Sequence, residues 1–257
     1  MDAREWLGLR PTHNPMRWYL PVTPGISTGH GFLFGGCALG AAISALEGST
    51  GRSVVWATAQ YLSYARPPAV MDIDVTVASE GRNITQARAV GTVGNTEILT
   101  VNAALGDREF PSSGQWPKMP DVPPPDQCLP REGRMHVEDS IMSRLDQRWA
   151  HTDPESGRTV LWSRLPDVLE VSAPALAVMG DYVPLGLGQA LEQDTTSNSL
   201  DNTLRLGTVV PTDWVLIDIR IELVTRGFGH GTVYLWAPDG TLMAAASQSA
   251  IVREFNP

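Results

Sequence analysis

The chain has 257 residues, of which 42% are hydrophobic and 18% charged, and its formal net charge is −9. This composition is typical of a soluble globular protein with enough chain for two small domains or one large one. The acidic balance argues against nucleic acid as the main partner, because binding phosphates requires a basic surface. Cys37 and Cys128, the only cysteines, form neither a disulfide framework nor a metal-binding spacing, so we expect no metal and no cofactor.

The N-terminal residues and the apolar runs favour a cytoplasmic location. MDAREWLGLR, the first ten residues, lacks the basic-then-apolar order of a secretory signal. The longest apolar run, residues 32–46, is shorter than the ~18 residues that a membrane-spanning helix needs. We therefore expect a cytoplasmic protein with no membrane span.

The first half of the chain predicts one helix followed by antiparallel strands. Residues 16–23 are typical of a strand, and the glycine- and alanine-rich residues 34–48 indicate a helix buried on nearly every side. Further strands are predicted at 53–65, 71–79, 84–93 and 96–105, with turns at Pro67-Pro68, 81–83 and Gly94-Asn95. We assign residues 1–107 to this N-terminal unit.

Residues 108–135 are predicted to form a linker. Seven prolines between positions 111 and 130 exclude a helix or a central strand. A proline-rich segment of this kind is extended and semi-rigid.

Residues 136–257 repeat the order of the first half. Strands are predicted at 143–151 and 157–165, and a helix at 172–181 with Ser172 as its N-cap. A loop containing Pro184, Gly186 and Gly188 is expected next. The remaining strands are predicted at 198–207, 214–224, 229–237 and 241–254.

The two halves follow one plan. MDIDVTV (71–77) and IDIRIEL (217–223) both alternate apolar with polar residues, which places one face of each strand in a core. A helix wrapped by a strongly bent antiparallel sheet is a hot-dog unit. The predicted fold is therefore α+β, a double hot-dog of two antiparallel sheets, each around a central helix. An open sandwich or a lipocalin-like barrel is the alternative, and neither of these has a central helix.

Three polar residues stand where apolar ones are expected. Asp181 closes the apolar segment ALAVMGD and is either a surface residue or a general base or nucleophile, since a buried carboxylate is costly without hydrogen bonds. Gln248 lies among alanines and either pairs across strands or points into a site. Ser199 either bonds the local backbone or belongs to the same site. His30, in a Gly-His-Gly loop, is a further candidate.

The ordered motifs resemble the acyl-CoA thioesterase II (TesB-like) family, whose members have a double hot-dog fold. The resemblance rests on FGG before the small-residue helix, TVNAALG, MGDYVP, SNSLDNTLRL, the PDG turn and SQSAIVR. It covers most of the chain.

The resemblance implies a catalytic set and a reaction. In that family an Asp, a Ser or Thr hydroxyl and a Gln orient the water that attacks an acyl-CoA thioester. These residues match Asp181, Ser199 and Gln248. A backbone N–H near Gly35 or Gly36 would bind the developing oxyanion as a substrate-binding group. Family analogy also implies a homo-oligomer.

Two other functions remain open at this point. A hot-dog dehydratase or hydratase would use His30 with an acid, and a non-catalytic acyl-binding protein would keep the fold without turnover.

The offset between the two repeats aligns Gly35 with Asp181, Ser53 with Ser199 and Asn102 with Gln248. We therefore expect the first half to have an amide and a hydroxyl but no carboxylate at the helix position.

Overall fold

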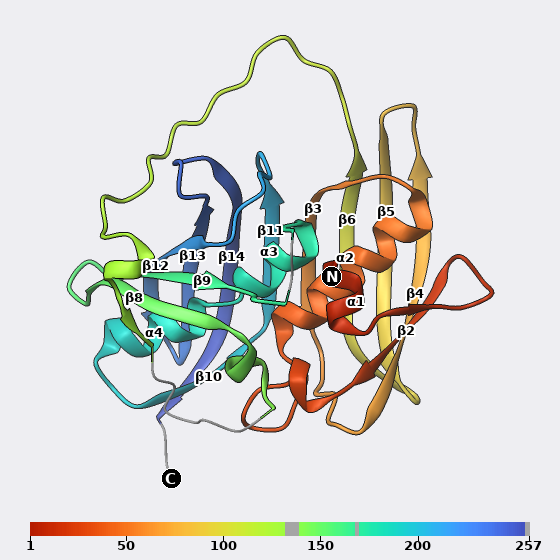
Figure 1. Cartoon of the computed structure of the whole chain (residues 1–257). Helices are drawn as coiled ribbons and strands as arrows, with labels where there is room; N and C mark the ends of the chain where they lie inside the picture. Colours follow the sequence, from red (N-terminus) through yellow and green to blue (C-terminus); the bar gives the residue numbers. More distant parts are fainter. Residues whose placement is uncertain (132–138, 168–169, 255–257) are drawn as a thin grey trace.

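The computed structural model describes residues 1–131, 139–167 and 170–254 (Figure 1). The first half comprises α1 (Ala3–Leu7), β1 (Arg10–Pro11), β2 (Arg17–Val22), the 3-10 helix η1 (Pro24–Ile26), α2 (Gly35–Thr50), β3 (Val54–Tyr61), β4 (Ala69–Glu80), β5 (Ile84–Val93) and β6 (Thr96–Gly106). The predicted helix and the strands after it are confirmed to within a few residues. The predicted boundary between linker and second unit, at 135 and 136, lies outside the described residues.

The second half begins after a segment that carries the 3-10 helix η2 (Pro125–Gln127). Its elements are β7 (Leu129–Pro130), η3 (Ile141–Arg144), β8 (Asp146–Asp153), β9 (Arg158–Arg164), α3 (Ala173–Met179), α4 (Val183–Leu191), β10 (Thr195–Ser199), β11 (Asp201–Leu206), β12 (Val215–Thr225), β13 (Phe228–Trp236) and β14 (Leu242–Glu254).

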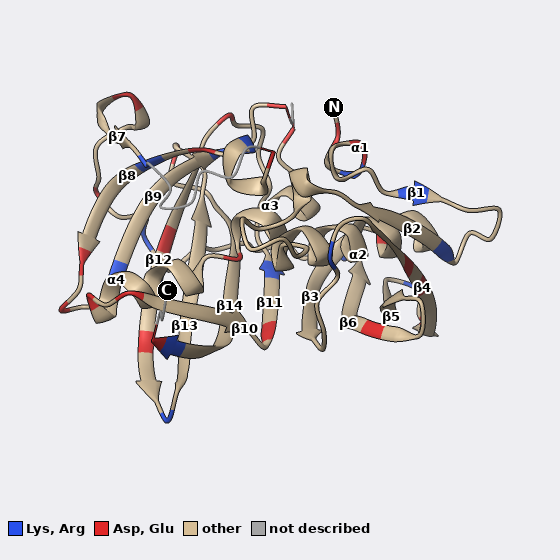
Figure 2. Ribbon diagram, turned by 90° about the horizontal axis from the view of Figure 1, so that it is seen from below, with Lys and Arg blue, Asp and Glu red and all other residues tan. Residues whose placement is uncertain are grey.

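The strands form one continuous 14-stranded sheet, where the sequence predicted two. The two halves meet where β3 pairs antiparallel with β11. Outward from this junction the strand order is β6, β5, β4, β2 on one side and β14, β13, β12, β9 on the other, so the two halves share one plan. Each junction strand would otherwise present unpaired backbone groups at an edge, and their pairing satisfies these groups. The helices α2, α3 and α4 lie on the concave side of the sheet (Figure 2).

Helix α2 is buried along most of its length, as predicted, and packs on the strands of the first half and on α3. Its glycines permit the contact with α3. A Cβ at Gly36 would lie 2.8 Å from the Ala177 carbonyl oxygen, and one at Gly40 would lie 2.8 Å from the Pro174 carbonyl oxygen. The small residues of α2 therefore bring two helix backbones close together.

The prediction of a loop around residues 184–188 was wrong, because these residues form α4. Pro184 occupies the first turn, where its missing N–H has no helical partner to lose. Gly186 lies against β12, since a Cβ there would be 2.5 Å from the Ile219 Cγ2. The helix predicted at 172–181 is confirmed as α3, which ends at Met179. It packs on α2, however, and the helix that packs on the strands of the second half is α4. Ser172 is the N-cap residue of α3 but makes no side-chain capping bond.

Part of the linker lies on the outer face of the second half. Met119, Val122 and Cys128 pack with a small apolar cluster that includes Trp162 and Trp236. The Trp162 indole N–H donates to the Pro123 carbonyl at 2.9 Å. This segment therefore shields apolar side chains that would otherwise face solvent.

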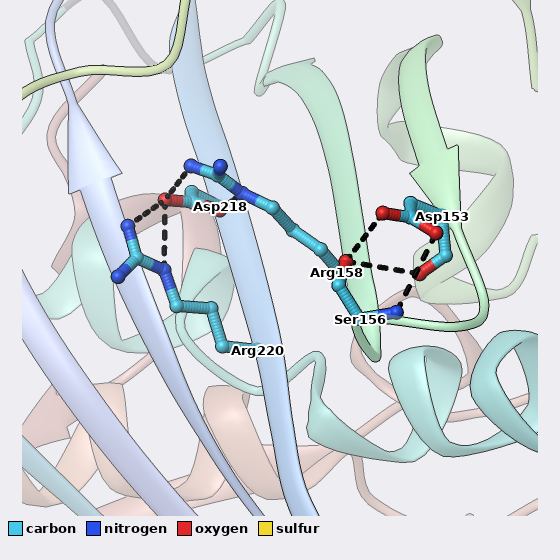
Figure 3. Close-up of polar contacts among 5 residues, drawn as sticks. All are labelled: Asp153, Ser156, Arg158, Asp218 and Arg220. Atoms are coloured by element: carbon cyan, nitrogen blue, oxygen red, sulfur yellow. Dashed lines mark hydrogen bonds and ion pairs between the residues drawn. The ribbon is translucent and has the colours of Figure 1, made fainter.

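An ion-pair cluster forms around a buried carboxylate on β12. The Asp218 side chain is fully buried and accepts hydrogen bonds from Arg158 and Arg220 (Figure 3). A buried carboxylate requires such partners, because an unpaired charge there costs several kcal/mol.

Within the described residues, no helix is long and apolar enough to cross a membrane.

Substituting Gly40 tests the helix contact. Gly40→Ala forces a methyl group against the Pro174 carbonyl and should lower the free energy of unfolding by about 1–3 kcal/mol. The control is Gly188→Ala on α4, where the nearest atom to the new Cβ is 3.6 Å away, and it should stabilise by up to about 1 kcal/mol. Urea unfolding measures both. Equal effects of the two substitutions would contradict close packing of α2 on α3.

Candidate active site

Asp181 lies at the junction of the two halves. It follows α3 and precedes α4, and its side chain reaches the N-terminus of α2 in the first half. The Gly36 backbone N–H donates to Asp181 Oδ2 at 2.6 Å. The first N–H groups of a helix have no intrahelical partner and favour a negative charge. The first half therefore supplies the electrostatic support for this carboxylate.

Gln248 holds the other oxygen of Asp181. It lies on β14 between Ala246 and Ala250, whose side chains are also buried. Its Nε2 donates to Asp181 Oδ1 and, at 3.1 Å, to Ser199 Oγ. Its Oε1 accepts from the Val183 N–H at 3.1 Å, which fixes the orientation of the amide. A flipped amide would place two donors together at Val183 and two acceptors together at Asp181.

Ser199 completes the convergence of the three predicted residues. It is the last residue of β10, opposite Ala250 of β14, and this pairing brings its hydroxyl to the Gln248 amide. The neighbouring Asp201 has a different role, since its Oδ1 accepts the Ser249 N–H at 2.9 Å and so ties the start of β11 to β14.

Burial raises the pKa of Asp181 from its ordinary value of 3.8 to about 6. The hydrogen bonds from Gln248 and Gly36, together with the nearby Ser199 hydroxyl, act in the opposite direction and lower it. Desolvation dominates because the residue is only 6% exposed. A carboxyl with this pKa is ionised at neutral pH and can accept a proton at little cost.

Gly35 and Gly36 provide room for this arrangement. A Cβ at Gly35 would lie 2.7 Å from Asp181 Oδ2 and 3.1 Å from the Tyr61 hydroxyl oxygen. A side chain at Gly35 would therefore displace the groups that face the carboxylate. The Gly36 N–H already bonds Asp181, so this particular donor is occupied.

The first-half counterparts suggested by the repeat lie elsewhere. Asn102 pairs with Thr58 and is exposed, whereas its neighbours Val101 and Ala103 face the core. Ser53 is also exposed. Thr58 of β3 and Thr203 of β11 face each other on the two matching strands. Asn102 pairs with Thr58, whereas the residue that pairs with Thr203 is Ser247 and not Gln248, so the offset of the repeat is out by one residue here. His30 lies on an exposed loop with its ring stacked on Phe32.

Two further polar side chains at the site were missed from the sequence. Tyr61 ends β3 and Asn202 lies on β11, so they come from the two strands that join the halves. Asn202 was visible only as part of the SNSLDNTLRL motif, and Tyr61 only as an aromatic residue ending a strand of small ones.

Among the described residues, no group of three or more His, Cys, Asp or Glu side chains could hold a metal ion.

Residues 115–252, more than half of the chain, match the family described as the acyl-CoA thioesterase C-terminal domain. The chain belongs to the acyl-CoA thioesterase family. It is thus a thioester hydrolase, and the resemblance found in the sequence is confirmed. The search of curated proteins gives no match.

Solved structures extend the similarity in fold over nearly the whole chain. A candidate thioesterase from Novosphingobium aromaticivorans DSM 12444 is 34% identical, covering 95% of this chain and 98% of that one, with a TM-score of 0.89. A hot-dog protein of unknown function from Alicyclobacillus acidocaldarius is 17% identical over 99% and 98%, with a TM-score of 0.88. The acyl-CoA thioesterase II TesB2 from Mycobacterium marinum is 20% identical over 99% of each chain, with a TM-score of 0.79.

The raised pKa of Asp181 predicts how this thioesterase's stability changes with pH. Between its unfolded pKa of 3.8 and its folded pKa of about 6, the folded chain keeps a proton that the unfolded chain has lost. The contribution of this group to the free energy of unfolding is therefore largest at low pH. It should fall by about 2–3 kcal/mol from about pH 4 to pH 7.

The measurement compares the wild type with Asp181→Asn, which does not titrate. The difference in unfolding free energy, wild type minus variant, should decrease over this pH range, whatever the absolute stability of the variant. A difference that stays constant or increases would contradict a raised pKa.

Proposed function

We propose that the chain hydrolyses an acyl-CoA thioester to the free acid and CoA by water that Asp181 activates and that Gln248 and Ser199 position. The observation that carries this proposal is the buried Asp181 carboxylate, held by Gly36 and Gln248 beside the Ser199 hydroxyl. This is the set of groups that a thioester hydrolase needs to orient and deprotonate a water molecule.

The proposed reaction begins when Asp181 accepts a proton from water while the water oxygen bonds the thioester carbonyl carbon. The Ser199 hydroxyl fixes the water through its oxygen, which accepts from Gln248 and has a second lone pair to accept from the water, while its hydrogen faces Asp181. Collapse of the tetrahedral intermediate breaks the carbon–sulfur bond. The proton on Asp181 then passes to the departing thiolate, which restores the carboxylate.

We favour a base over a nucleophile for Asp181 because both of its oxygens are anchored. Oδ2 accepts from Gly36 and Oδ1 accepts from Gln248. Accepting a proton requires only a remaining lone pair on an oxygen. Direct attack would require that oxygen to move to within a covalent bond length of the carbonyl carbon, away from these donors.

The proposal also includes an organisation of the chain. We propose that residues 1–107 and 136–257 are two hot-dog units with a linker at 108–135, and that the second unit carries the catalytic side chains. Gly35 and Gly36 would be the first unit's substrate-side contribution, since their missing side chains leave the space in front of Asp181 open.

Thiol release from a panel of acyl-CoAs tests the activity. The wild type should turn over, and Asp181→Asn should lose roughly 10²–10⁴-fold in rate, because it removes the base. The matched control is Asp74→Asn on β4, an exposed carboxylate that pairs with Arg17, and it should leave the rate unchanged. Turnover in Asp181→Asn equal to that of the control would refute the assignment. Ligand binding without thiol release in the wild type would instead indicate a non-catalytic acyl-binding protein.

The pH dependence of hydrolysis offers a second test. The rate at low substrate should rise with pH through about 6, because only the ionised Asp181 accepts a proton. Gln248→Glu places a like charge against Asp181, raises its pKa and should move this rising limb to higher pH. A profile that is the same in both proteins would argue against Asp181 as the titrating base.

A further inference from the structure

The Tyr61 hydroxyl and the side-chain amide of Asn202 are buried at the junction of the halves, with the hydroxyl near Asp181. All three polar atoms are inaccessible to solvent, and within the described part of the chain their only hydrogen-bonding contact is the one between Asn202 and the Tyr61 hydroxyl. Buried polar groups are nearly always paired, and leaving one unpaired costs about 1–3 kcal/mol. Three such atoms with only each other as hydrogen-bonding neighbours, one of them near a candidate base, indicate groups that can bind a partner from outside the chain.

The junction of the halves places the pair on one face of the sheet. Asn202 lies opposite Ala59, and Tyr61 is two residues further along β3, so both side chains project to the side that carries Asp181. The Tyr61 N–H donates to the Leu200 carbonyl at 2.9 Å, which holds the end of β3 beside the Ser199–Asp201 bend. Their positions are therefore set by backbone pairing.

Gly35 relates Tyr61 to the base, and Asn202 is placed by its contact with Tyr61. The point where a Gly35 Cβ would stand is 2.7 Å from Asp181 Oδ2 and 3.1 Å from the Tyr61 hydroxyl oxygen. The carboxylate and the hydroxyl thus face the same small region, although no hydrogen bond joins them. A reacting group held there would meet a proton acceptor on one side and a donor on the other.

We propose that Tyr61 and Asn202 bind the carbonyl oxygen of the thioester and stabilise the oxyanion of the tetrahedral intermediate. This inference rests on the proposed hydrolysis at Asp181. The Tyr61 O–H and the Asn202 Nδ2–H donate to the oxygen as the attacking water bonds the carbon and the carbon–oxygen double bond becomes single. They replace the Gly36 N–H, which Asp181 occupies. The charge on the oxygen develops as Asp181 becomes neutral, so the two changes do not oppose each other.

The chemistry of both groups suits this role. Burial, followed by the nearby Asp181 and Asp201, raises the pKa of Tyr61 well above 10, while Asn202 acts in the opposite direction. Tyr61 therefore stays protonated over the working pH range, and Asn202 does not titrate. Both remain neutral hydrogen-bond donors, as an oxyanion site requires.

The experiment compares Tyr61→Phe and Asn202→Leu with the wild type and with Thr85→Val. Thr85 also has a buried hydroxyl without a hydrogen-bond partner. It lies far from the site, because its strand partner Leu105 on β6 is in turn paired with Val54, at the other end of β3 from Tyr61. We expect kcat to fall roughly 10²–10³-fold in each site variant with a smaller rise in KM, since the bonds are already made to the carbonyl oxygen and strengthen in the transition state. Thr85→Val should retain the wild-type kcat. The midpoint of thermal unfolding should change little in Tyr61→Phe, because only the contact with Asn202 is lost.

Two non-hydrolysable probes separate this role from a structural one. The first is an acyl-CoA ketone with a methylene in place of the thioester sulfur, and the second is an alkyl-CoA thioether without a carbonyl. Tyr61→Phe and Asn202→Leu should weaken binding of the ketone and leave that of the thioether unchanged. The infrared carbonyl stretch of the ¹³C-labelled ketone should shift to lower frequency in the wild type, and this shift should be reduced in both variants.

The outcomes distinguish the two proposals. Unchanged kcat and ketone binding in both site variants, in a protein that Asp181→Asn inactivates, would overturn the oxyanion role and leave the hydrolysis standing. Equal losses of ketone and thioether binding, with a lowered unfolding midpoint, would also overturn it. A wild type without thiol release refutes the hydrolysis, and the ketone measurements then decide alone whether the pair binds a carbonyl.

Discussion

A carboxylate buried between two halves of a chain needs donors from both, and this requirement organises the structure around Asp181. Its side chain is taken out of water and compensated by the Gly36 N–H from the first half and the Gln248 amide from the second. The Gly36 donor is available only because α2 lies close to α3, which Gly36 and Gly40 permit. The pairing of β3 with β11 then brings Tyr61 and Asn202 to the same place. Neither half alone contains the site.

The duplicated plan is therefore symmetric in strand order and asymmetric in chemistry. The second half contributes Asp181, Ser199 and Gln248, whereas the first contributes a helix N-terminus, two glycines and Tyr61. This division has a physical basis, because two carboxylates facing each other at the junction would repel, whereas a carboxylate facing a helix N-terminus is stabilised. Asn102 on the exposed face shows that the first half does not keep a second amide in the core.

Periodicity and turn residues were sufficient to predict most strands and the buried helix α2, because those signals are local. The helix α4 could not be predicted, since Pro184, Gly186 and Gly188 favour a loop until the contact of Gly186 with Ile219 is known. The single sheet depends on pairing between β3 and β11, which are about 140 residues apart and leave no local pattern. Asp181 and Gln248 could be singled out as polar residues in apolar segments. Tyr61 could not, because only the folded chain shows that its buried hydroxyl lies near Asp181.

The central claim, that Asp181 activates water and does not attack the thioester itself, can be tested by a single turnover in ¹⁸O-labelled water with enzyme in excess over an acyl-CoA. Mass spectrometry would then analyse the released acid and the peptide that contains Asp181. Activation of water predicts one ¹⁸O atom in the acid and none in the Asp181 carboxylate. Unlabelled acid in the first turnover, with ¹⁸O in Asp181, would contradict the account, because it would mean that an acyl–Asp181 anhydride forms and that water then attacks its Asp181 carboxyl carbon.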